Sequence, residues 1–179
     1  AESSLRKDVS ADVLVDDWGV PWRRSPGSLY FEPVDPPLRH ATVDDLEKYP
    51  WPNLAPPDRF DRLVSEAKTI QQAGYATVLL SGVALFEQAY LMRGLDTLLM
   101  DLATEPEFFT ALLTKLKNLM VAYVGQLLKD AGPYVDVIIT GDDLGMTAGP
   151  MMSPHCYRQF IKPHHAELLG AIKQRISGK

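Results

Sequence analysis

The placement of proline divides this sequence into two segments that must fold by different rules. Nine of its 14 prolines lie before residue 58. Proline removes a backbone hydrogen-bond donor and restricts the residue before it, so no long helix can run through that segment. We therefore predict that residues 1–57 form an irregular arm of extended segments and turns, with one short hairpin.

This arm carries too many aromatic residues for a disordered tail, so we expect it to be ordered and packed. Its aromatic residues are Trp18, Trp22, Tyr30, Phe31, Tyr49 and Trp51. A short helix is predicted within it over residues 42–48, because Thr42 and Asp45 have the spacing of a capping box.

Residues 58–179 form the second segment, in which helical and strand patterns alternate. Two runs are apolar on both faces and predict buried strands over 75–81 and 134–140. The spacing of apolar residues predicts helices over 59–73, 84–93, 96–102 and 105–129, and a last helix from Ser153 to Arg175. Asp58 and Ser153 are the predicted N-caps of the first and last of these helices. The apolar face predicted for the first helix comprises Phe60, Leu63, Val64, Ala67 and Ile70, and the predicted helix ends are at Gly74, Gly94 and Gly132-Pro133. Pro163 should kink or split that last helix.

Strands separated by helices are typical of a parallel sheet covered by helices. A closed (β/α)8 barrel takes about 250 residues, whereas this chain has 179 and only two convincing strands. The pattern therefore predicts an α/β fold. It leaves two alternatives open, a small open sheet and a piece of a larger barrel.

Composition and charge exclude several classes of protein. The net charge is -5 and no basic stripe is present, so a nucleic-acid-binding protein is not expected. The longest apolar run, residues 75–80, is far too short to cross a bilayer. Cys156 is the only cysteine, so no internal disulfide can form, and we expect a cytoplasmic, reducing environment.

Two adjacent acids, Asp142 and Asp143, follow the second predicted strand, and Glu87 and Tyr90 follow the first. Parallel α/β folds gather their functional groups at the carboxyl ends of the strands. An unpaired buried carboxylate is costly, so acids at this place indicate catalysis or the binding of a cation or a substrate amine. We expect at least one of the two to be partly buried and hydrogen-bonded. The alternative is that they cap the loop or face solvent.

A second cluster combines His155, Cys156, His164 and His165. These residue types suit zinc, but pairs eight or nine residues apart on a helix interrupted by Pro163 do not match a compact set of ligands. We predict that the four do not form a metal site by themselves. The histidines are interpreted as residues of the helix surface, and Cys156 as small packing at the helix start.

A third cluster spans residues 16–24 and contains two acids, two tryptophans and two arginines. Such a set can line a pocket for a flat, anionic ligand, with Trp18 and Arg23 as the candidate binding residues. A turn packed by two aromatic residues is the alternative.

Several stretches of the chain together resemble the uroporphyrinogen decarboxylase family. The most specific is Asp136–Pro163, which contains Gly141-Asp-Asp-Leu-Gly and Tyr157-Arg-Gln-Phe-Ile-Lys-Pro. The others are Asp17-Trp-Gly, Pro37-Leu38, Thr42–Glu47, Tyr49–Pro52, Phe86–Gly94 and Leu99–Glu107. The resemblance implies a partial (β/α)8 TIM barrel preceded by the proline-rich arm, with residues 58–179 supplying about two of its eight strands.

The family that the chain resembles contains two chemistries. One branch decarboxylates uroporphyrinogen without a cofactor, in porphyrin biosynthesis. The other transfers methyl groups between a corrinoid protein and a thiol or similar acceptor, using a zinc-bound thiolate. The Asp-Trp-Gly opening and the Gly141–Gly145 loop are more similar to the methyltransferase branch, which is our leading interpretation, with decarboxylation as the alternative.

The resemblance also assigns individual residues. Tyr90 matches a position where decarboxylases have a tyrosine that contacts the substrate, and Asp142 matches a position where they have an acidic residue. Asp143 falls where they have serine or threonine, a departure that weakens the decarboxylase alternative. We therefore expect Asp142, Asp143 and Tyr90 to be catalytic, and Trp18, Arg23 and Glu87 to bind a small-molecule substrate.

The zinc-binding His-x-Cys-Gly of the methyltransferases would follow just past Lys179, so no cofactor is expected within these residues. The expected full-length enzyme would use zinc and a corrinoid partner. A third interpretation is a non-catalytic fragment that associates, because an incomplete barrel leaves open sheet edges. Under it the chain alone is inactive, and is a homo-oligomer or part of a longer chain.

Overall fold

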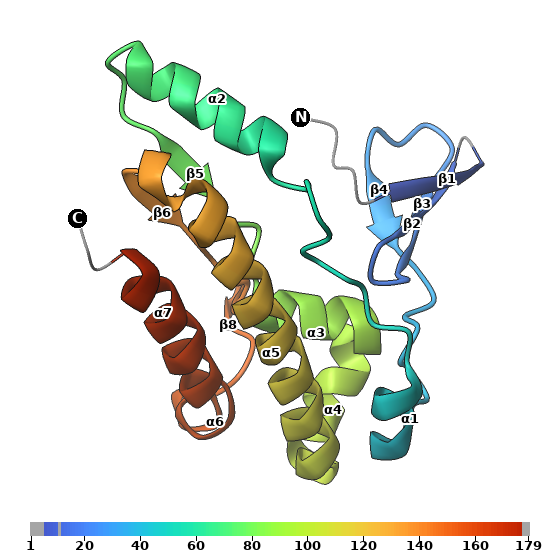
Figure 1. Cartoon of the computed structure of the whole chain (residues 1–179). Coiled ribbons are helices and arrows are strands. Elements are labelled where there is room, and N and C mark those ends of the chain that lie inside the picture. The colour runs from blue at the N-terminus through green and yellow to red at the C-terminus, as the bar shows by residue number, and fades with distance from the viewer. Residues whose placement is uncertain (1–5, 11, 177–179) are drawn as a thin grey trace. The chain divides into compact units, whose positions relative to one another are not determined.

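The structure is a computed structural model in which residues 6–10 and 12–176 are described (Figure 1). The chain divides into two compact units. Unit 1 comprises residues 1–52 and 87–112, and unit 2 comprises residues 53–86 and 113–179. The chain passes from one unit to the other after Pro52, and then inside two of its helices, α3 (Leu85–Arg93) and α5 (Pro106–Ala131).

Unit 1 begins with a four-stranded antiparallel sheet in the order β1-β2-β3-β4. The strands are β1 (Arg6–Ser10), β2 (Val13–Asp16), β3 (Pro21–Arg24) and β4 (Phe31–Pro33). The predicted irregular arm is thus more regular than expected. The reason is that Pro21 begins a strand and Pro33 ends one, and proline is tolerated at such positions.

The helical part of unit 1 follows the sequence prediction closely. Helix α1 (Val43–Lys48) begins with the predicted capping box, in which the Asp45 carboxylate accepts hydrogen bonds from the backbone and the hydroxyl of Thr42. Gly94 separates α3 from α4 (Leu95–Thr104) with a φ of 88°. Glycine adopts this left-handed conformation without the strain that a Cβ would add.

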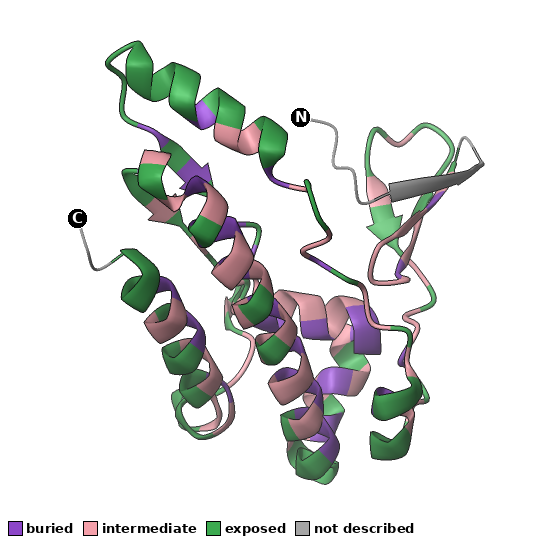
Figure 2. Ribbon diagram, in the orientation of Figure 1, coloured by how far each residue is buried: buried purple, intermediate pink, exposed green. Residues whose placement is uncertain are grey.

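Unit 2 begins with α2 (Asp61–Gln72), which starts later than predicted. Asp58 does not cap it, because its φ of 64° places it in a turn before the helix. Gly74 ends α2 as predicted, and the Tyr75 N–H donates to the carbonyl of Ile70, as in a Schellman motif. Much of α2 is exposed (Figure 2), and Ile70 of its predicted apolar face is exposed too.

Strands β5 (Val78–Leu80) and β6 (Val137–Ile139) pair in parallel, in the register Val78↔Val137 to Leu80↔Ile139. Both predicted strands exist, but the expectation that they are buried on both faces is wrong. Leu79 is 7% exposed and Leu80 is 73% exposed. Alternate side chains point to opposite faces of a sheet, and among the described residues only one face of this pair is covered.

The architecture is therefore mixed α/β, as predicted. Among residues 6–10 and 12–176 the strands form a four-stranded sheet and two pairs, and no closed barrel. The third sheet is the short hairpin of β7 (Gly145–Met146) and β8 (Gly149–Pro150) in the loop after β6.

The long helix predicted over 105–129 is confirmed as α5. It carries a buried apolar row along its length: Phe108, Phe109, Leu112, Leu113, Leu116, Met120, Val124, Leu127 and Leu128. A short 3-10 turn, η1 (Gly132–Tyr134), ends it where Gly132 and Pro133 were predicted to do so. No helix among the described residues combines the length and apolar composition that a bilayer crossing requires.

The last helical segment consists of α6 (Pro154–Cys156), a π-helical turn η2 (Tyr157–Ile161) and α7 (Lys162–Ile176). Ser153 caps it as predicted, because its hydroxyl accepts a hydrogen bond from the Cys156 N–H at 3.1 Å. The π turn lies directly before Pro163, whose ring cannot fit a regular helix interior. The predicted disturbance at Pro163 thus takes the form of a π turn.

Candidate functional site

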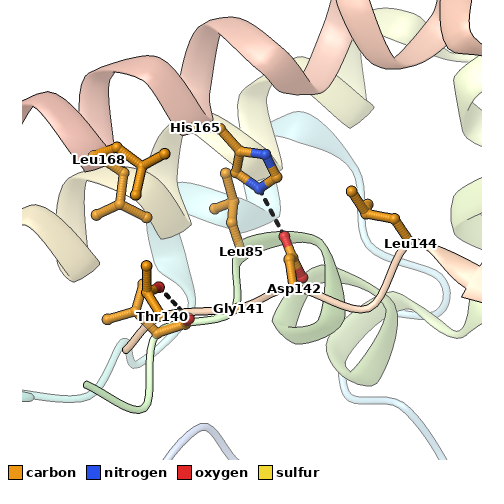
Figure 3. Close-up of a pocket in the computed structure, with 9 residues that line it drawn as sticks. Leu85, Thr140, Gly141, Asp142, Leu144, His165 and Leu168 are labelled. Atoms are coloured by element: carbon orange, nitrogen blue, oxygen red, sulfur yellow. Dashed lines mark hydrogen bonds and ion pairs between the residues drawn. The ribbon is translucent and has the colours of Figure 1, made fainter. Parts of the chain in front are cut away.

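The candidate site lies in unit 2, where the polypeptide leaves the carboxyl ends of β5 and β6 (Figure 3). The loops after the two strands are joined by hydrogen bonds. The Ser81 N–H donates to the carbonyl of Ile139 at 3.0 Å, and the Thr140 hydroxyl donates to the carbonyl of Val83 at 3.0 Å. These bonds hold the backbone directly before Gly141 and Asp142 in place.

The Asp142 side chain is 7% exposed and accepts hydrogen bonds on both oxygens. Its Oδ2 accepts from the Phe86 N–H at 2.7 Å, in the first turn of α3, and its Oδ1 accepts from the Asp143 N–H at 3.1 Å. A helix N-terminus favours a negative charge, so this environment stabilises the carboxylate. The prediction that at least one of the two acids is partly buried and hydrogen-bonded is confirmed for Asp142.

A third partner of Asp142 is His165, which the sequence analysis placed in a separate cluster and interpreted as a residue of the helix surface. Nε2 of His165, on α7, lies 2.8 Å from Asp142 Oδ2, and its Nδ1 lies 3.3 Å from the hydroxyl of Tyr157. The His165 side chain is only 16% exposed, so the interpretation of this residue as part of the helix surface is wrong. The contact joins residues 23 apart in sequence, and no local spacing rule predicts it.

One signal could have identified His165. It precedes Leu168 and Leu169 by three and four residues, so all three share a helix face. Leu168 is buried. A histidine on the face that packs inward needs a polar partner, and Asp142 supplies it.

Asp142 and His165 form the polar end of a cavity of about 200 Å³. The aliphatic residues that line it are Val83, Leu85, Leu144, Leu168 and Leu169, and Thr140 and Gly141 complete the wall. Figure 3 shows His165 and Asp142 pointing toward each other beside Leu85. No lysine or arginine is among the described residues that line the cavity.

Asp143 is exposed and does not line this cavity. Its carboxylate accepts a hydrogen bond from the Gly145 N–H at 3.3 Å, within the loop that leads to the β7–β8 hairpin. The adjacent acids therefore have different surroundings, and the catalytic role predicted for Asp143 stays a prediction.

Tyr90 and Glu87 belong to unit 1, on α3. Tyr90 lines a separate cavity of about 290 Å³ in that unit, together with Arg39. The Arg39 guanidinium is held by Asp96 through two hydrogen bonds of 3.1 Å. Glu87 is half-buried in the first turn of α3. The substrate contacts predicted for both residues stay predictions.

The cluster at residues 16–24 comprises the end of β2, the turn that follows it, and β3. The Asp16 carboxylate accepts hydrogen bonds from the Trp18 N–H, the Val20 N–H and the Trp22 indole N–H at 2.9–3.0 Å. This geometry matches the alternative of a turn packed by aromatic residues. Arg23 is exposed on β3, and the binding roles predicted for Trp18 and Arg23 stay predictions.

The other three residues of the predicted His/Cys cluster are not among the described residues that line the cavity. His155 is exposed and Cys156 half-buried. Nδ1 of His164 is buried without a hydrogen-bond partner, and burial, aided by the nearby Lys117 charge, lowers the pKa of this histidine. Among the residues that the structure describes, no three His, Cys, Asp or Glu side chains converge as a metal site.

Comparison with known families gives one match, to the family described as uroporphyrinogen decarboxylase (URO-D), over residues 29–178. The matched region includes the loop of Asp142 and the helix of His165. Searches of curated proteins and of solved structures gave no match.

Proposed function

Because the chain belongs to the uroporphyrinogen decarboxylase family, we propose that it is part of a methyltransferase of that family. The proposed reaction moves a methyl group between a corrinoid protein and a small thiol. The observation that carries the proposal is the cavity at the ends of β5 and β6, with its aliphatic wall and its single polar end at Asp142 and His165.

The size of the cavity supports a small acceptor. An apolar cavity of about 150 Å³ in another protein holds a molecule as large as benzene. A cavity of about 200 Å³ therefore suits the reactive end of a small thiol. A tetrapyrrole such as uroporphyrinogen is several times larger, and most of it would lie outside.

The charge of the cavity supports the same choice. Uroporphyrinogen carries several carboxylates, which proteins usually bind with arginine or lysine. The cavity presents Asp142 instead, and no lysine or arginine is among the described residues that line it. A neutral thiol meets no such repulsion.

Zinc, which the methyltransferase branch uses, does not fit the described residues. Asp142 and His165 give two groups of a ligand type, and both are engaged with each other and with backbone or Tyr157. Structural and catalytic zinc sites need at least three protein ligands. We therefore assign no step to zinc. A methylated corrinoid would supply the methyl group as an electrophile.

The exposed face of the β5–β6 pair is a candidate surface for association. Val78, Leu80, Val137 and Ile139 are each about half exposed or more, which is unusual for four neighbouring aliphatic residues. We propose that this face associates, with a second copy or with further strands of a longer natural protein. Light scattering at micromolar concentration should show a species larger than 19.9 kDa, and L80K should reduce the amount of this species. A monomer for both would contradict the proposal.

The experiment for the proposed reaction compares two activities of the full natural protein that carries this sequence. With methylcobalamin and small thiols, we expect methyl transfer, which is measured by the change in corrinoid absorbance. With uroporphyrinogen, we expect no decarboxylated porphyrinogens by chromatography. D142N should lose the methyl transfer, and D44N, at an exposed acid of α1, should keep it. Decarboxylation without methyl transfer would overturn the proposal.

A further inference from the structure

We propose that unit 1 holds a second binding site, which takes a small aliphatic amino acid in its zwitterionic form. The site is the cavity of about 290 Å³ formed by residues 33–39 and 90–95. Arg39 and Asp35 are the charged groups among the described residues that line it. The family resemblance assigns a role to neither residue, and the proposed methyl transfer uses neither.

The guanidinium of Arg39 presents one edge that the protein does not use. Its two terminal nitrogens donate to the Asp96 carboxylate at 3.1 Å each, and Nη1 also donates to the Thr97 hydroxyl at 3.4 Å. Within the described part of the chain, Nε–H and the second N–H of Nη2 have no acceptor. These two N–H groups share the other edge of the planar group, an arrangement that matches a carboxylate. The side chain is 39% exposed, so a ligand can reach this edge.

The protein fixes the guanidinium of Arg39 before any ligand binds. Asp96 holds its far edge, and the Leu38 N–H ties the neighbouring backbone to α3 by donating to the Met92 carbonyl at 2.8 Å. Gly94 lets the guanidinium approach the backbone, because a Cβ at this position would lie 2.9 Å from Nη2. A group held in place in this way loses little further freedom when a ligand binds.

Asp35 supplies the opposite charge on the same cavity wall. It is exposed, and its carboxylate makes no hydrogen bond or ion pair with the other described residues. The charge of Arg39 is already balanced by Asp96, so a ligand with a carboxylate alone would enter a site of net negative charge. A ligand that also carries an ammonium group gives Asp35 a partner. The charges of the wall therefore favour a zwitterion over a simple anion.

The rest of the cavity indicates the body of the ligand. Its apolar wall comprises Pro33, Val34, Pro36, Leu91 and Leu95. An apolar cavity of about 150 Å³ in another protein holds benzene, and this cavity has about 290 Å³. It therefore has room for an amino acid with a branched aliphatic side chain.

The test compares three probes that share one aliphatic body, by isothermal titration calorimetry with the full chain. L-leucine carries both charges, 4-methylpentanoate lacks the ammonium group, and 3-methylbutylamine lacks the carboxylate. We expect the Kd of L-leucine to be at least about tenfold lower than that of either analogue, since each analogue loses one charge-assisted contact. Equal Kd values for the three probes, or no binding of L-leucine, would overturn the proposal.

Variants then test the two charged ends. R39K keeps the charge but lacks two parallel N–H groups on one edge, so it should raise the Kd of L-leucine by at least about tenfold. R62K is the matched control, because Arg62 on α2 is exposed and pairs with Glu66 at 2.8 Å. D35N should remove the preference for L-leucine over 4-methylpentanoate. Unchanged binding of L-leucine by R39K, or an unchanged preference in D35N, with the variants folded by circular dichroism, would overturn the proposal.

Discussion

Two pairs of oppositely charged side-chain types, one in each unit, differ in what surrounds them: one is enclosed by protein groups and the other lies at a cavity. In unit 1, Arg93 and Asp101 join by hydrogen bonds of 2.7 and 3.1 Å. The remaining guanidinium nitrogen donates to the carbonyls of Leu38 and Ala41, and the ring of Phe108 lies 4.0 Å from the guanidinium carbon. In unit 2, Asp142 and His165 form the end of a cavity.

The difference suggests different roles: the Arg93–Asp101 pair stabilises the fold of unit 1, whereas the Asp142–His165 pair can contact a ligand in the cavity. Every guanidinium nitrogen of Arg93 is used inside the protein, and the pair is buried. No group remains to act on a substrate. Arg93 and Asp101 both lie in stretches that carry the family resemblance, so part of that resemblance comes from residues with a packing role. Resemblance therefore does not by itself mark a catalytic residue.

The largest effect that would sharpen this comparison is expected at Arg93. R93M removes one partner of a buried pair and leaves the Asp101 charge uncompensated, which costs about 3–5 kcal/mol of unfolding free energy. Urea denaturation followed by circular dichroism measures the loss. The double variant R93M/D101L should regain much of the stability, since it leaves no buried charge. A single variant as stable as the original would show that the pair does not anchor unit 1.

A smaller loss of stability is expected at Asp142. D142N weakens the acceptor for the Phe86 N–H and for His165, and leaving such donors poorly satisfied costs about 1–3 kcal/mol. The same denaturation experiment measures it. D143N is the matched control, because its carboxylate is exposed, and surface changes usually stay within about 0.5 kcal/mol. Equal losses for the two variants would remove the distinction between the neighbouring acids.

The smallest effect is a pH dependence at His164. Burial lowers the pKa of His164 below its ordinary value of 6.5. Below that pH the unfolded chain binds more protons at this residue than the folded chain, so stability falls as the pH falls. H164Q should lose less stability than the original protein between about pH 7 and pH 5. An identical pH dependence in both proteins would contradict the burial of this imidazole.

Local rules predicted the helices well, because their determinants lie close together in the sequence. The ends of α2 at Gly74 and of α3 at Gly94, and the cap of the last segment at Ser153, follow from single residues. The long apolar row of α5 predicts that helix along its whole length. These features depend on neighbours within a turn or two.

Contacts between distant residues were not predictable in the same way. The four-stranded sheet of unit 1 was predicted only in part. The prolines excluded long helices and indicated extended segments with one short hairpin, but the pairing of four strands depends on contacts between segments that no local pattern shows. The prolines of β3 and β4 lie at strand ends. The site was found in part, through Asp142 at the end of β6. Its partner was missed because the π turn and the fold bring Tyr157 and His165 to it, and neither is readable from spacing.

The central claim, that the cavity beside Asp142 and His165 is the substrate site, is tested most directly by filling it. Leu144 lines the cavity, whereas Met146, in the same loop, is 54% exposed and does not. We expect L144W to lower kcat/KM for the thiol by at least about tenfold, equivalent to about 1.4 kcal/mol, and M146W to leave it unchanged. Equal kcat/KM values for two folded variants would contradict the claim.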